Sequence, residues 1–446
     1  MKKIEIVKTY VEGNTIRYQV REEKGLGLLQ QEVVDLFIRY HGEDYYDLSK
    51  CPQSILQLPI SLYLLPVTYF YKVELIIPEM DKTLFDQLPA IYDAYSKIYG
   101  PFNAEWRGKV TIGKIVKNTP VLDAKYDKVV FFSGGVDACH AGINNSGKRS
   151  LLVNIPDIET QAKNEGPLRE EKFSLIKSFS KIVDSDWLLI SNNFNAQSTK
   201  YHEVDTYLRK SLGLNSPAFN FDGWGGIRYI ANMCSVAPIA YLSGIKELVM
   251  GSAFEQLEDQ HFLNLDGAHP DITDSIGFAD IRFTEQEGLL VRRSKKVSNI
   301  IDWCKKHNVK TKLWACFRDG YTQCGYCGKC VRTQLNILCA GENPIDWGFE
   351  GFSETKLAKH ISKYKYVESN PCWLWDNIET IDGNKTYPYC NELLHWLKDI
   401  GYKEYSAVAK KKAAERAKYS KLRLALSVHR YPHYLYVIIS RLIGRK

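Results

Sequence analysis

The stretch Val129 to Gly142 contains residues of the types that could hold a phosphate group. Four apolar residues run directly into two glycines that are flanked by a serine and an aspartate, and small residues follow. This order predicts a strand, a loop and a helix, and such a loop and helix N-terminus aim backbone N–H groups at one point. A glycine pair after a strand also makes an ordinary tight turn, so the glycines alone leave both interpretations open. The candidate phosphate-binding residues are Ser133, Gly134, Gly135, Val136 and Asp137.

Four cysteines near the C-terminal third of the chain have the spacing of metal ligands. Two successive Cys-x2-Cys steps place Cys324, Cys327 and Cys330 on one tight turn, and seven residues separate Cys316 from the first of them. Four sulfurs can close a tetrahedral Zn²⁺ shell with no open position, so we expect a structural zinc site. Free thiols, a redox pair and an iron–sulfur cluster are the alternatives.

The two motifs together resemble a known enzyme family. The SGGVD run resembles the SGGxDS signature of the PP-loop ATP pyrophosphatases. Its combination with the Cys-x7-Cys-x2-Cys-x2-Cys spacing about two hundred residues later is similar to the 7-cyano-7-deazaguanine synthase branch of that superfamily. The resemblance covers about residues 127 to 340 and includes Arg332 after the last cysteine. Because the flanks are unusual, the chain resembles a divergent relative and not the queuosine-pathway enzyme itself.

This resemblance implies chemistry by adenylation, with ATP and Mg²⁺ as cofactors. A small-molecule or protein carboxylate attacks the α-phosphorus of ATP, pyrophosphate leaves, and an amine or ammonia then displaces AMP. Asp137 is implied to lie near the magnesium, and Lys296 matches the family's lysine, although Lys295 and Arg293 lie close enough to take that role. A charge run at a helix start is also typical of solvated residues. Relatives of this kind occur in phage-defence and other accessory gene clusters.

One departure from the signature bears on activity. Ala138 stands where the signature has serine, so one phosphate hydrogen bond is missing and we expect weaker nucleotide binding without complete loss. Two other functions therefore stay open. One is a non-catalytic ATP-binding or interaction protein with a degenerate loop, and the other is a tRNA-modifying enzyme of the same superfamily that uses a basic tail on RNA.

The elements that must position these residues alternate between strand and helix from 124 to about 345. This pattern predicts an open parallel α/β sheet, with strands at 129–132, 151–155, 187–191 and 247–252 and a long apolar helix from about Gly226 to Tyr241. Ligands of such sheets lie beyond the carboxyl ends of the strands. The residues that follow these ends, and so could contact a nucleotide, are Asn154, Asn192, Gly251 and Ser252.

The loop at 267–275 is a further candidate, because it carries one histidine and two carboxylates after a strand end. His269 and Asp271 could handle protons or contact substrate. Alternatively, Asp274 and Ser275 cap a helix and His269 rests on the surface. Glu255 and Asp259 are similarly placed and similarly ambiguous.

The flanking regions lack a recognisable chemical motif. Residues 1–123 read as a small α+β unit, with alternating strands at 4–7, 15–20 and 71–77 and a helix over Thr83 to Tyr99. Residues 346–446 form a third, helical region. Its last part, 401–446, carries twelve Lys and Arg against two Asp and Glu, a net of +10, while the whole chain has +7. Such a tail could bind nucleic acid, an anionic membrane or a protein partner, or it could pack on the body with its lysines solvated.

Composition is that of an ordinary globular protein, with 45% hydrophobic and 25% charged residues among 446. Neither a signal peptide nor an apolar run long enough to cross a bilayer is visible. Eleven cysteines in such a chain favour metal binding and free thiols over disulfides. We therefore expect a cytoplasmic location, with peripheral membrane attachment through the tail as an open alternative.

Overall fold

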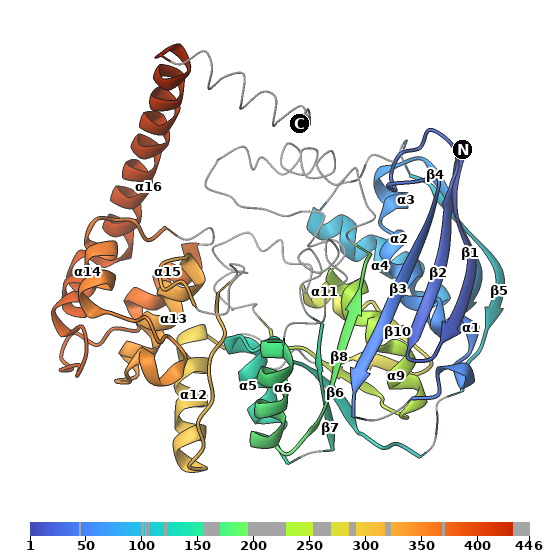
Figure 1. Cartoon of the computed structure of the whole chain (residues 1–446), viewed down its shortest axis with the longest axis horizontal. Helices are drawn as coiled ribbons and strands as arrows, with labels where there is room; N and C mark the ends of the chain where they lie inside the picture. The colour runs from blue at the N-terminus through green and yellow to red at the C-terminus, as the bar shows by residue number, and fades with distance from the viewer. Residues whose placement is uncertain are drawn as a thin grey trace.

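The computed structural model describes residues 1–43, 46–99, 102, 105, 107–119, 121, 123–147, 149–155, 170–194, 229–252, 269–284, 291–316, 323–367 and 371–430. Within these ranges the strands form one sheet of eleven, in the order β10-β11-β9-β6-β7-β8-β3-β2-β1-β4-β5 (Figure 1). The bounds of the strands are β1 Lys2–Glu12, β2 Thr15–Glu22, β3 Val33–Gly42, β4 Val73–Asp81, β5 Lys109–Val116, β6 Lys128–Phe131, β7 Ser150–Asn154, β8 Asp186–Asn192, β9 Glu247–Val249, β10 Gly277–Phe278 and β11 Ile281–Phe283.

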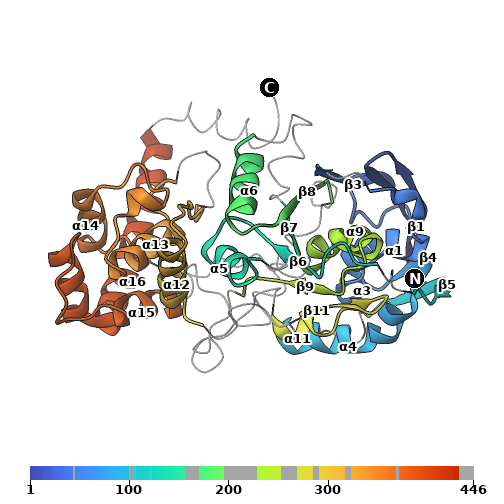
Figure 2. The same cartoon turned by 90° about the horizontal axis from the view of Figure 1, so that it is seen from below.

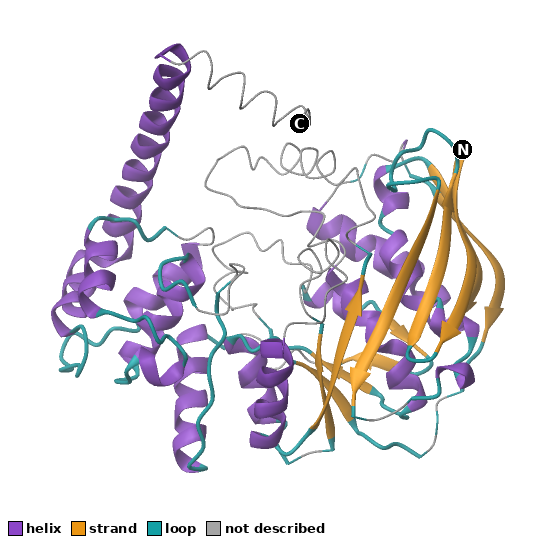
Figure 3. Ribbon diagram, viewed as in Figure 1, coloured by secondary structure: helices purple, strands orange, loops and turns teal. Residues whose placement is uncertain are grey.

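The helices of the described ranges lie over the sheet and in a separate group beside it. Helices α1 to α4 and α9 lie beside the N-terminal strands, α11 contacts α4, and α12 to α16 gather on the other side of the molecule, beyond α5 and α6 (Figures 2 and 3). Their bounds are α1 Gln53–Leu56, α2 Leu58–Leu64, α3 Val67–Phe70, α4 Lys82–Tyr99, α5 Val136–Asn144, α6 Glu170–Ile182, α9 Ala237–Leu242, α11 Pro270–Thr273, α12 Arg293–Lys306, α13 Gly328–Cys339, α14 Glu354–Ser362, α15 Pro371–Glu379 and α16 Asn391–Arg430. Within the described ranges, 3₁₀ turns lie at Leu48–Lys50, Cys234–Val236 and Pro344–Trp347.

The predicted α/β sheet is confirmed at the level of its architecture. Strands β11, β9, β6, β7 and β8 pair in parallel, as crossover connections require. Every residue of β7 is buried, because helices cover both faces of a central parallel strand. The edge strand β5 alternates between exposed and half-buried residues. The central strands are thus continuously apolar in sequence because their position in the sheet buries both of their faces.

The N-terminal strands continue the same sheet. β3 pairs antiparallel with β8, so that Ile38 lies opposite Asn192. The strands and the helix predicted for residues 1–123 are present as β1, β2, β4 and α4. The division of the chain into three regions stays a prediction, but the first region does not have a sheet of its own.

The long apolar helix predicted from Gly226 to Tyr241 is wrong in its described part. Residues 229–233 are helical, a 3₁₀ turn follows at Cys234–Val236, and α9 starts at Ala237. Pro238 lies in the first turn of α9 and has no N–H to donate to the carbonyl of Cys234. The apolar pattern therefore continues across a break in the helix.

Candidate functional site

The glycine loop joins β6 to α5 and leaves the first turn of that helix without a side-chain cap. Gly134 has a φ of 82°, and a Cβ there would lie 2.5 Å from Leu175 of α6 and 3.2 Å from Trp314. Glycine is therefore required both by the backbone angle and by the space. Gly135 is the N-cap of α5 and offers no side-chain acceptor to the N–H groups of the first turn. Ser133, beside them, is exposed.

Two cations from α12 meet the carboxylate of Asp137 at this helix end. Arg293 Nη1 lies 2.6 Å from Asp137 Oδ2, and Lys296 Nζ lies 3.2 Å from Oδ1. Lys296 also donates to the carbonyl of Ser252, just after β9. The ammonium-bearing side chain of Lys296 is 0% exposed and that of Asp137 is 19% exposed. We call Asp137, Arg293 and Lys296 the ion-pair cluster.

The electrostatics of the ion-pair cluster leave a net positive charge at the loop. Burial alone raises the pKa of Asp137, but the adjacent Arg293 and Lys296 outweigh it and hold that pKa well below its usual range. One carboxylate therefore faces two cations, and the N-terminus of α5 adds the positive end of its dipole. Such a site attracts a ligand with several negative charges.

The predicted strand-end residues lie around the same place. A Cβ on Gly251 would be 2.3 Å from the carbonyl oxygen of Asp137, so the end of β9 packs directly on the first turn of α5. Asn154, at the end of β7, donates to the carbonyl of Phe132 at 2.6 Å. The Oδ1 of Asn154 and the Nδ2 of Asn192 are buried and have no hydrogen-bond partner among the residues that the structure describes. Because unpaired buried amide atoms cost free energy, these two side chains are candidate ligand contacts.

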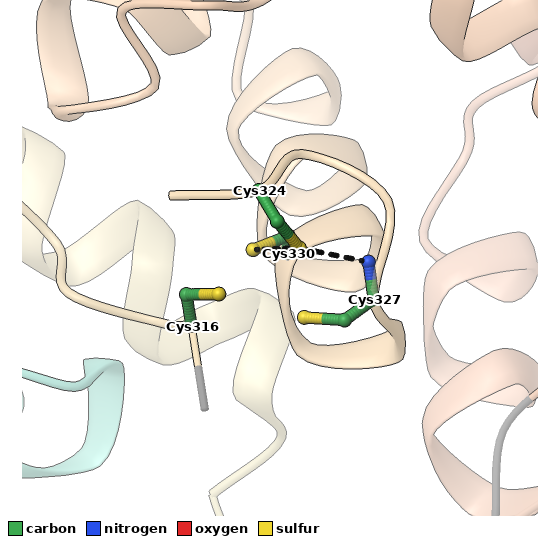
Figure 4. A group of neighbouring side chains, drawn as sticks. All are labelled: Cys316, Cys324, Cys327 and Cys330. Carbon is green, nitrogen blue, oxygen red and sulfur yellow. Dashed lines mark hydrogen bonds between the residues drawn. The ribbon is translucent and has the colours of Figure 1, made fainter. Parts of the chain in front are cut away.

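The four predicted cysteines converge on one point (Figure 4). Their sulfur atoms all lie within 4.8 Å of one another, and Cys324 Sγ is 3.8 Å from Cys330 Sγ. Four sulfurs bound to one zinc at about 2.3 Å stand about 3.8 Å apart, so the residues fit a tetrahedral metal. A hydrogen bond between the two thiols lowers the pKa of Cys327 and raises that of Cys330, so a bound metal would have to displace the proton that Cys330 keeps. This cluster could hold a structural metal such as zinc.

An extended segment connects the cysteine cluster to the glycine loop. Trp314 donates its backbone N–H to the carbonyl of Gly134 at 2.7 Å, two residues before Cys316. Gln323 holds the same segment from the other side, because its amide accepts from Ala315 N and donates to the carbonyl of Leu313. Sequence reasoning missed Trp314 and Gln323, which lie next to the cysteine motif but outside its spacing.

His269 and Asp271 have contacts of another kind. His269 is the N-cap of α11, where its Nδ1 accepts from the backbone N–H of Asp271 at 3.2 Å. The carboxylate of Asp271 forms an ion pair with Lys97 of α4. The alternative that Asp274 and Ser275 begin a helix while His269 rests on the surface is therefore wrong, because Asp274 is the C-cap of α11 and the half-buried His269 is its N-cap. None of these described contacts reaches the ion-pair cluster, and a role in proton transfer stays a prediction. Glu255 and Asp259 lie outside the described residues.

The basic tail begins on a helix that extends away from the body (Figure 1). Helix α16 breaks at Gly401, where φ is 70°, and its cations Lys410, Lys411 and Lys418 are exposed. Arg416 donates to the carbonyl of Tyr364 and so ties the near face of the helix to the body. Binding of nucleic acid, membrane or protein stays a prediction. Of the helices that the structure describes, none has the length and apolar character needed to cross a bilayer.

Comparison with known proteins identified no relative of this chain. No protein-family model matches the chain, and neither a curated protein nor a solved structure matches it. The functional interpretation therefore depends on the motifs and on the geometry of the described residues.

Replacing one cysteine of the cluster tests the metal site. We expect about one zinc per chain in the purified protein, and Cys324→Ser should lose most of it because only three thiolates remain. Cys51→Ser, which changes a buried cysteine outside the cluster, should keep its metal. Elemental analysis measures both proteins, and visible absorption identifies an iron–sulfur cluster. Undiminished zinc in Cys324→Ser would contradict the site.

The ion-pair cluster predicts a pH dependence of stability. Because the pKa of Asp137 is lowered in the folded protein, its ionised carboxylate adds to the free energy of unfolding. This contribution is complete above about pH 4 and is lost as pH falls through the pKa of the folded state. Asp137→Asn leaves the buried Lys296 without its carboxylate and should cost about 3–5 kcal/mol at pH 7. Urea unfolding should therefore show a smaller loss of stability in this variant at pH 3 than at pH 7. The control is Asp302→Asn, on the exposed face of α12, and equal stability of the two variants at pH 7 would refute the expectation.

Proposed function

We propose that this chain is an ATP-dependent enzyme of the PP-loop type, similar to the 7-cyano-7-deazaguanine synthases. It adenylates a carboxylate with release of pyrophosphate and passes the acyl group to an amine or ammonia. The observation that carries this proposal is the ion-pair cluster at the uncapped N-terminus of α5, next to the SGGVD loop. A structural site alone would not need two buried cations around one carboxylate at a helix N-terminus.

The residues of the loop and of α12 have different roles in the proposed reaction. The N–H groups of the loop and of the first turn of α5 receive the phosphates, and Ser133 adds a hydroxyl. Both oxygens of Asp137 are engaged by Arg293 and Lys296. When a triphosphate binds, these two cations turn to its oxygens and stabilise the charge of the departing pyrophosphate. Asp137, once free of these two cations, would be the residue to hold Mg²⁺, and that ion would neutralise phosphate charge.

The remaining candidates have supporting roles in this proposal. The Oδ1 of Asn154, which has no partner in the described part of the chain, can accept a hydrogen bond from the nucleotide, and the Ser252 carbonyl fixes Lys296. We assign the cysteine cluster to zinc. Four sulfurs would fill all positions of a tetrahedral shell, so the metal would bind no substrate and would hold Cys316 near the Trp314 contact to the loop.

Pyrophosphate exchange tests the proposed reaction. With a panel of carboxylates, labelled pyrophosphate should enter ATP in the presence of the protein, and Lys296→Gln should lower the rate about 10²-fold or more. The matched control is Lys295→Gln, because Lys295 is the exposed neighbour on the same turn.

The other outcomes of the exchange assay distinguish the alternative functions. ATP binding without exchange, AMP or pyrophosphate for any substrate would point to a non-catalytic nucleotide-binding protein. Exchange that requires added RNA would point to a tRNA-modifying enzyme.

Restoring the signature serine tests the loop. Ala138 is 7% exposed, in the first turn of α5. Ala138→Ser should bind ATP about tenfold more tightly, since it regains one phosphate hydrogen bond. Isothermal titration measures the affinity. Ala141→Ser, at a buried position one turn later, serves as the control. Unchanged affinity in Ala138→Ser would show that another group fills this place.

A further inference from the structure

Both cations of the candidate site come from the first turn of helix α12. Positive charges are electrostatically unfavourable at that end of a helix. Arg293 and Lys296 are the first and fourth residues of the helix, with Lys295 between them and Arg292 as the N-cap. Positive charges at a helix N-terminus oppose the helix dipole and destabilise the first turn. No side chain of the N-cap and no acidic residue of the first turn compensates for this within α12. The first turn therefore needs an acceptor from elsewhere in the chain.

Asp376 of α15 supplies that acceptor from 82 residues further along the chain. Its Oδ2 accepts from the backbone N–H of Ser294 at 3.0 Å, and its Oδ1 accepts from the Ser294 hydroxyl at 2.8 Å. Asp376 as a whole is 1% exposed. On the same helix, the ring of Trp375 lies 4.6 Å from the Arg292 guanidinium. The N-cap and the second residue of α12 are thus both held by α15.

The neighbouring residue of α15 anchors that helix in turn. Asn377 donates to Asn336 Oδ1 at 2.6 Å and to the carbonyl of Arg332 at 3.1 Å, both on α13. Tyr366 donates to Asn377 Oδ1 at 2.8 Å. Because α13 also carries Cys330, the C-terminal helices and the cysteine cluster form one support for the first turn of α12.

We propose that Asp376 is a positioning residue of the candidate nucleotide site. It acts as a remote cap that holds the first turn of α12 in the orientation from which Arg293 and Lys296 reach Asp137. The inference deepens the proposed function and depends on it for the identity of the ligand. It assigns to the C-terminal region a direct effect on affinity for the triphosphate.

Two substitutions at Asp376 separate its hydrogen bonds from general packing. Asp376→Ala removes both acceptors, so hydrogen exchange of the amides in the first turn of α12 should be at least about tenfold faster, and ATP affinity about tenfold weaker. Asp376→Asn keeps the shape and one acceptor oxygen and should stay within about threefold of the unchanged protein. Glu379→Gln, in an exposed ion pair on the same helix, is the matched control and should change neither property.

The measurements are made on the full chain, at temperatures where urea titration shows each variant to be folded. If Asp376→Ala does not fold, Ser294→Ala removes the hydroxyl half of the contact and should give a smaller change of the same sign. Exchange in the first turn of α12 that equals that of the unchanged protein would overturn the proposal, and so would equal loss of affinity in Glu379→Gln. Exchange needs no nucleotide. If the unchanged protein binds no ATP but Asp376→Ala still shows faster exchange, the positioning role is therefore intact and the proposed function is refuted.

Discussion

The contact of Asp137 with Arg293 and Lys296 is the interaction on which the candidate site depends. A side chain with the charge of Lys296 at 0% exposure is stable only beside a compensating carboxylate and a hydrogen-bond acceptor, and Asp137 and the Ser252 carbonyl provide these. The same contact joins α5 to α12 and to the end of β9. This ion pairing therefore holds the glycine loop, the helices and the end of β9 in one arrangement. The net charge of the ion-pair cluster is positive, beside the loop that carries the exposed Ser133.

The elements around this contact support it from two sides. On one side, the extended segment before Cys316 bonds to Gly134 through Trp314, so the geometry of the cysteine cluster reaches the loop through three residues. On the other side, α15 caps α12 through Asp376 and Ser294. A metal at the cysteines and the packing of the C-terminal helices therefore have the same consequence, which is to fix the cations relative to the glycine loop.

Local patterns predicted most of what is close in sequence. The run from β6 through the loop into α5, the strands at β7 and β8, and the meeting of four cysteines all follow from apolar periodicity, turn residues and short spacing. The helix across Pro238 was predicted wrongly, because its apolar pattern is unchanged by the missing N–H that breaks it. His269 gave an ambiguous pattern because the same residue types serve as cap and as catalyst.

By itself the sequence determined the phosphate-loop pattern, the metal-ligand spacing and the α/β class, since each depends on residues within one or two elements. Only the tertiary structure decided that Arg293 and Lys296 both face Asp137, that the first five strands extend the same sheet through β8, and that Asp376 caps a helix 82 residues before it. These contacts join distant segments, and a charge run such as RRSKK has the same composition whether it is solvated or buried. Whether such a charge is solvated or forms a buried ion pair depends on its burial and on its partner in the other segment. Both are set only when the segments pack together.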